Sequence, residues 1–160
     1  MENSGIALEQ KLRAEGERTL TFFKSLSAQS WAQIVFEGEG DQQWSVRDVF
    51  EHLITSEEGL RLIFRDVASG GPGVQEGFSI DESNQRAKGK LAGLSLDQLF
   101  ERYLACRHRT SDFAGTLSDA KLATVGRHPF LGPSKLEDML RLVNLHNSMH
   151  VKDVKKAINK

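Results

Sequence analysis

The chain of 160 residues is 39% hydrophobic and 27% charged, with a formal net charge of −1. This composition is that of an ordinary soluble globular protein, long enough to bury a core without disulfides or a structural metal, and we expect a single domain over residues 1–160. The near-neutral charge argues against a nucleic-acid partner. The sequence shows no signal-peptide core and no apolar run of membrane-spanning length, so we expect a cytoplasmic protein without a membrane partner. The single Cys106 agrees with that compartment.

Apolar residues spaced three and four positions apart predict long helices. The first covers residues 7–26. The second begins after Ser45, which forms a capping box with Asp48, and ends about 24 residues later at the glycine- and proline-rich residues 69–73.

Two more capping boxes, at residues 95–98 and 134–137, open the third and fourth helices. The third helix carries an apolar stripe as far as Leu117. Cys106 falls on that stripe, which favours a small buried side chain over a reactive thiol.

The connections between these helices differ in length. Residues 27–43 predict a short helical turn and a loop, and residues 74–94 predict a long crossover with one short helix over 81–88. The prolines and glycine of the last connection, residues 118–133, are expected to exclude regular structure, and no strand is expected anywhere. The predicted fold class is therefore all-α, a four-helix bundle with at least one long crossover.

His146 and His150 lie four residues apart in the fourth predicted helix. On a helix this spacing puts both side chains on one face, with Cβ atoms about 5–6 Å apart, close enough for both rings to bind one metal ion. The apolar stripe from Leu136 to Val154 continues onto this face, so both rings should point inward. The alternative is a pair of core histidines satisfied by hydrogen bonds.

Metal sites in helical bundles are built from side chains on facing helices, so the pair needs a third ligand from another helix. Three candidates remain. His128 lies in a proline-flanked loop, where capping is the expected use, and His108 lies between two arginines on an expected wet face. His52 lies inside the second helix, at the edge of its apolar stripe, and is the best candidate.

Residues 44–53 read WSVRDVFEHL. This segment resembles the Trp-Ser-x-x-(Asp/Glu)-x-x-x-His-Leu signature of the DinB/YfiT-like superfamily, a family of damage-inducible four-helix bundles. A second block, HPFLG at 128–132 followed by the histidine pair, is similar to the C-terminal segment of that family. The resemblance implies a divalent metal, most commonly zinc or nickel, held by His52, His146 and His150. It also implies kinship with S-transferases and isomerases that use low-molecular-weight thiols.

Three neutral imidazoles would leave the ion its full charge and an open position, which is the pattern of a catalytic site. A thiol or water entering that position would be acidified. We expect a low-molecular-weight thiol to attack an electrophilic small-molecule substrate in a pocket lined by residues 74–94. One alternative is a hydrolase using metal-activated water, for which the sequence identifies no general base. Another is a non-catalytic metal-binding or sequestering stress protein, in a monomer or a homodimer.

Five further side chains are candidates for the surroundings of the metal. Ser56, Glu57 and Asn147 are near enough in sequence to orient the imidazoles from outside, although a surface role for Glu57 is equally expected. Asn84 and Arg86 could contact a polar substrate, the arginine through a bidentate bond to a carboxylate.

Overall fold

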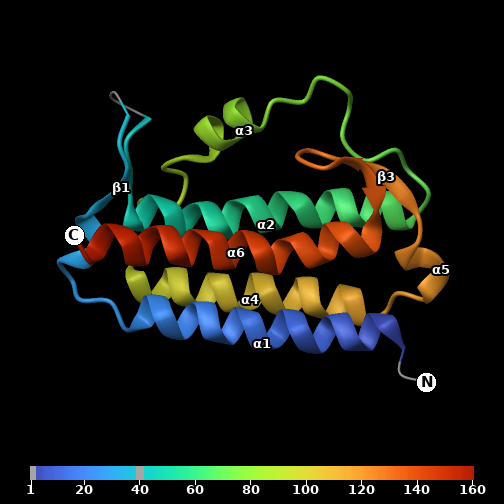
Figure 1. Cartoon of the computed structure of the whole chain (residues 1–160), viewed down its shortest axis with the longest axis horizontal. Helices are drawn as coiled ribbons and strands as arrows, with labels where there is room; N and C mark the ends of the chain where they lie inside the picture. The colour runs from blue at the N-terminus through green and yellow to red at the C-terminus, as the bar shows by residue number, and fades with distance from the viewer. Residues whose placement is uncertain (1–2, 39–41) are drawn as a thin grey trace.

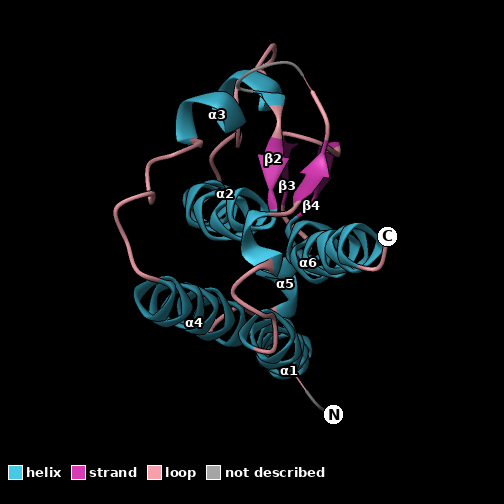
Figure 2. Ribbon diagram, turned by 90° about the vertical axis from the view of Figure 1, so that its left-hand side faces the viewer, coloured by secondary structure: helices cyan, strands magenta, loops and turns pink. Residues whose placement is uncertain are grey.

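Four long helices form the framework of the protein in the computed structural model, which describes residues 3–38 and 42–160. They are α1 (Ser4–Lys24), α2 (Val46–Ala68), α4 (Leu96–Gly115) and α6 (Leu136–Ile158). Seen along their axes, α2 and α6 lie side by side above α4 and α1 (Figure 2). The predicted four-helix bundle is thus confirmed. Within the described residues, no helix has both the length and the apolar character needed to cross a membrane.

A long crossover sets the direction of the helices. It leaves the end of α2, returns over that helix and enters α4, so α2 and α4 run in the same direction, whereas α6 runs opposite to α2 (Figure 1). The crossover carries the short helix α3 (Ile80–Ala87), close to the predicted residues 81–88. This helix lies over the N-terminal part of α2 (Figure 1).

Capping side chains fix where the helices begin. Ser45 and Ser95 form the predicted reciprocal capping boxes, with Asp48 and Gln98 respectively. The third predicted box is wrong, because α6 begins after Lys135 without a side-chain cap. Ser134 is held in a strand instead, and its hydroxyl donates to the carbonyl of Gly132 at 3.1 Å.

The prediction that the chain contains no strand is also wrong. Two short antiparallel pairs form, β1 (Ile34–Phe36) with β2 (Trp44–Ser45), and β3 (Val125–His128) with β4 (Gly132–Lys135). In the second pair, Pro133 pairs with Arg127. A two-stranded hairpin has only edge strands, where a residue without an N–H is tolerated.

Short helical segments complete the two remaining connections. The expected helical turn in residues 27–43 is the 3₁₀ helix η1 (Ser30–Ala32). The loop expected to follow it instead contains β1, and part of it, residues 39–41, lies outside the described residues. The last connection begins with α5 (Asp119–Leu122), capped by Ser118, which the sequence analysis did not predict.

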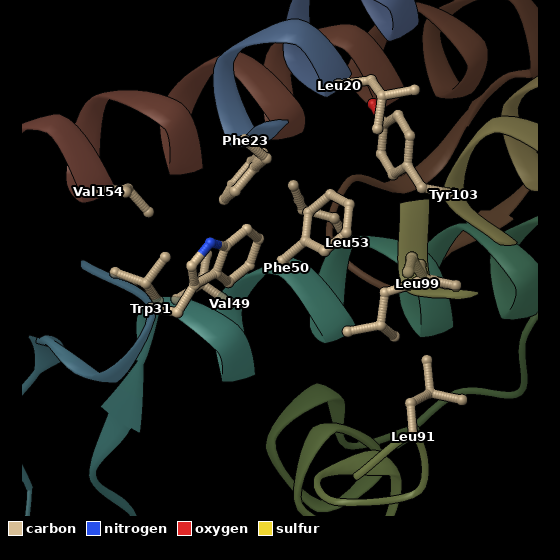
Figure 3. Packing of buried hydrophobic residues seen from close by; sticks show 12 residues of the cluster. Leu20, Phe23, Trp31, Val49, Phe50, Leu53, Leu91, Leu99, Tyr103 and Val154 are labelled. Carbon is tan, nitrogen blue, oxygen red and sulfur yellow. The ribbon is translucent and has the colours of Figure 1, made fainter. Parts of the chain in front are cut away.

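The core consists of two apolar clusters with polar residues between them. The first cluster surrounds Phe23 and Phe50 near one end of the bundle (Figure 3). The second surrounds Phe64 and Leu140 toward the other end. Along the helices, a set of buried polar residues falls between the two: Glu57, Arg61, Arg107, Thr110, Ser111 and Asn147.

Candidate metal centre

Three histidines meet between α2 and α6. His52 lies near the beginning of α2, and His146 and His150 lie one turn apart in the second half of α6. Because the two helices are antiparallel neighbours, these parts of them face each other. Nε2 of His146 lies 3.1 Å from Nε2 of His52 and 3.1 Å from Nε2 of His150. One nitrogen from each ring lies within 4.8 Å of the other two.

This arrangement fits a divalent metal ion. Zinc–nitrogen bonds of about 2.0–2.1 Å in tetrahedral geometry place two ligand nitrogens about 3.3 Å apart, close to the observed separations. The rings are also in the protonation state that a ligand needs. Burial, helped by repulsion from His150, lowers the pKa of His52 to about 4 and that of His146 to about 3. Burial also lowers the pKa of His150, against the opposing effect of Asp153. All three rings therefore present a free lone pair at neutral pH.

Side chains around the rings restrict their orientation. Oδ2 of Asp153 lies 3.3 Å from Nδ1 of His150, an electrostatic contact without hydrogen-bond geometry. The ring of Trp44 lies edge-on to His52, and that of Phe36 edge-on to His150, with centroids 5.5 and 6.0 Å apart. The sequence analysis missed these neighbours. The three-residue helical spacing to His150 could have indicated Asp153, but no local pattern indicates Phe36, which β1 brings to the site.

A small hollow of about 10 Å³, room for about one water molecule, lies beside His52, between α2 and α3. Its lining includes Glu51, whose side chain is only 8% exposed and accepts a bond from Nε of Arg47 at 3.2 Å. Burial raises the pKa of the Glu51 carboxyl, although Arg47 opposes this effect. Glu51 is thus a buried carboxylate that lines the same hollow as the candidate ligand His52, and the sequence analysis did not single it out.

Of the side chains expected to contact a substrate, Asn84 lines this hollow. Arg86 does not: it is exposed on α3, and its Nη1 lies 4.0 Å from Oε2 of Glu82, one turn away. The substrate contact expected for Arg86 stays a prediction.

The three residues expected to orient the imidazoles bond elsewhere. The Ser56 hydroxyl donates to the Leu53 carbonyl at 3.4 Å. The Asn147 amide accepts from the Tyr103 hydroxyl at 2.6 Å and donates to a carbonyl of its own helix. The Glu57 carboxylate is buried and accepts hydrogen bonds from Nε and Nη2 of Arg107. Among the described residues, none of these three side chains forms a hydrogen bond to a histidine of the cluster, because their polar atoms bond to helix backbone or to other side chains.

The two remaining histidines lie apart from the cluster. His128 is buried in β3, and its Nδ1 accepts the backbone N–H groups of Phe130 and Leu131 at 3.0 and 3.1 Å. It thus caps the hairpin turn, the use expected for it. His108 is exposed on α4, also as expected.

The fold is a four-helix bundle with a long crossover, and its cluster of three histidines lies beside a hollow. These features define a class of helical protein with a candidate metal centre. Residues 11–154 match the DinB superfamily, and the chain belongs to this superfamily. Its fold is similar to that of YfiT from Bacillus subtilis, described as a probable metal-dependent hydrolase with an unusual four-helix bundle topology. The TM-score is 0.67 at 16% identity, over 96% of this chain and 83% of that chain. No curated protein gives a significant match to the sequence.

Proposed function

We propose that this protein is an enzyme whose divalent metal ion, held by His52, His146 and His150, activates a nucleophile toward an electrophilic small molecule. The proposal rests on one observation: the Nε2 atom of His146 lies 3.1 Å from the Nε2 atom of His52 and 3.1 Å from that of His150. Lowered pKa values keep all three rings neutral, so they can bind a cation at neutral pH. Zinc and nickel are the expected metals, since imidazole suits both.

A divalent ion bound there supplies Lewis acidity, which lowers the pKa of a thiol or water that it binds. The protein's own groups supply positioning and proton transfer. Glu51 presents a buried carboxylate to the hollow, and its raised pKa makes it a better proton acceptor than an ordinary surface carboxylate. Asn84 on α3 also lines the hollow, and an amide there can bond a polar substrate.

Two reactions are compatible with this site. Hydrolysis needs a general base, and the presence of Glu51 in the hollow supports it, as does the description of YfiT as a probable metal-dependent hydrolase. Transfer of a low-molecular-weight thiol is supported by the resemblance to thiol-dependent S-transferases. A thiol is far more acidic than water, so its reaction does not require the carboxylate.

The experiment begins with elemental analysis of protein purified without an affinity tag, alongside His52→Ala and, as a matched control, His108→Ala. We expect about one equivalent of metal in the wild type and in the control, and a loss in His52→Ala. Metal retained by His52→Ala would contradict the proposed ligand set.

Activity is then measured on a panel of electrophiles and esters, with and without an added low-molecular-weight thiol. Turnover that requires the thiol identifies transfer, and turnover without it identifies hydrolysis. Activity that survives complete removal of the metal by chelation would refute both. Stoichiometric metal without any turnover would favour sequestration of the ion.

A further inference from the structure

A second hollow, of about 340 Å³, lies on the other side of α2, against α4. These two helices are neighbours in Figure 2. The hollow is lined by Glu58, Arg61, Arg102, Ala105, Cys106 and Arg109. Arg61 follows His52 by nine residues, which on a helix corresponds to about 13 Å along the axis and to the opposite face. The hollow is therefore separate from the histidine cluster.

Arg61 is buried without a charged partner. It is 8% exposed, and its Nη1 donates to the Cys106 carbonyl at 3.0 Å and to the Thr110 hydroxyl at 3.3 Å, both neutral acceptors. Within residues 3–38 and 42–160, no carboxylate forms an ion pair with it. Its Nε and Nη2 form no hydrogen bond there and are not enclosed. Two donors of this buried cation, which lines the hollow, thus remain without a partner among the described residues.

The nearby carboxylates are already engaged. Glu57 forms an ion pair with the buried Arg107, with Oε1 of the glutamate 2.7 Å from Nη2 of the arginine. Glu58 accepts two hydrogen bonds from the Arg102 guanidinium, of 2.9 and 3.1 Å. The exposed Arg109 adds a further positive charge at the rim. The lining therefore carries three guanidinium groups and one carboxylate, in a protein whose net charge is −1. Burying a cation without a counterion is unfavourable, so this excess charge indicates that an anion completes the site.

We propose that the hollow between α2 and α4 binds a small organic anion through a phosphate or carboxylate group, with Arg61 as its central ligand. A planar guanidinium with Nε and Nη2 both open matches the paired oxygens of such a group. The hollow is a binding site rather than a thiol-reactive one, since burial raises the pKa of the Cys106 thiol to about 12. The proposal does not depend on the metal centre.

The test uses the full chain, titrated with sodium phosphate or sodium acetate at an ionic strength held constant with sodium chloride. Binding is followed by the side-chain Nε–H resonances of arginine in nuclear magnetic resonance spectra, assigned through single variants. We expect a saturable shift of the Arg61 resonance with at least one of the two anions. Arg61→Met should weaken that binding by about tenfold or more, as expected for loss of charge-assisted hydrogen bonds. Arg13→Met, the same change on another face, should leave it unaltered.

A second variant keeps the test decisive should Arg61→Met fail to fold. Arg109→Gln changes only an exposed side chain at the rim and should weaken binding by about threefold, because it removes a charge that attracts the anion. The absence of saturable binding for both anions would overturn the proposal. So would unchanged binding in a folded Arg61→Met protein, or in Arg109→Gln if that is the only folded variant.

Discussion

Arg107 on α4 has a side chain that is only 1% exposed, and its Nη2 donates to Oε1 of Glu57 on α2 at 2.7 Å. Its Nη1 donates to the carbonyl of Leu12 on α1 and to Oδ1 of Asn144 on α6, each at 3.0 Å. One guanidinium therefore connects all four long helices. Because α2 and α6 carry the candidate metal ligands, this connection also helps to fix the position of one ligand-bearing helix against the other.

Glu57→Gln should be strongly destabilising, since it leaves the buried Arg107 without its counterion. We expect the free energy of unfolding to fall by about 3–5 kcal/mol. Glu58→Gln is the matched control: the same change at the next residue affects a half-exposed pair with Arg102, for which the expected loss is about 1 kcal/mol or less. Urea denaturation followed by circular dichroism measures both, and equal effects would contradict the assignment.

Removing the metal should leave the fold intact, because two apolar clusters hold the bundle together. His150→Ala is expected to lose the ion while keeping its helical circular-dichroism signal and a cooperative thermal transition. The transition temperature should fall by no more than the stabilisation that metal binding gave to the wild type. Collapse of helicity on chelation would show instead that the ion is structural.

Glu51→Gln separates the two proposed reactions. If the nucleophile is water, losing the carboxylate should slow turnover by about 10²–10⁴-fold at unchanged metal content. If the nucleophile is a thiol, turnover should change little. Metal analysis accompanies the rate measurement, because loss of the ion from this variant would make the rate uninformative about the base.

Acid should destabilise the protein through its buried histidines. Burial lowers the pKa of His128 to about 4 from the ordinary value of 6.5. Between these pH values the unfolded chain carries a proton that the native protein lacks, so the free energy of unfolding falls as the pH falls. The contribution is fully present above about pH 6.5 and is lost by about pH 4.

A substitution at this position tests that sign. His128→Asn keeps an acceptor for the two turn N–H groups but removes the titrating ring. Between about pH 6 and 5 its stability should depend less on pH than that of the wild type, by about 1 kcal/mol per pH unit. Urea titrations at several pH values measure the slope, and identical slopes would exclude His128 as a source of the effect.

Cys106 should be almost inert in the native protein. It is 4% exposed, and burial, together with the charge of Glu57, raises the pKa of its thiol to about 12. Alkylation near neutral pH should therefore be at least about 10³-fold slower than for an exposed thiol, because the thiolate is the reactive form. Labelling followed by mass spectrometry, with and without concentrated urea, tests this, and rapid labelling of the folded protein would contradict it.

The features that could be predicted from the sequence are those set within one or two helical turns. Apolar spacing indicated the four long helices, the pairs Ser45 with Asp48 and Ser95 with Gln98 marked two helix starts, and the four-residue spacing placed two histidines on one face. Each of these patterns depends only on neighbours along the chain, so it can be read without knowing the fold.

Contacts between groups that lie far apart in the sequence depend on the tertiary structure. Arg107 stands beside the exposed His108 on a segment expected to be wet, yet it is buried, because Glu57 from another helix supplies its counterion. Ser134 was expected to cap α6, but pairing with Gly126 holds it in a strand. The partner of a buried charge or of a strand lies far away in the sequence. The contact that stabilises such a group therefore cannot be predicted from the residues next to it.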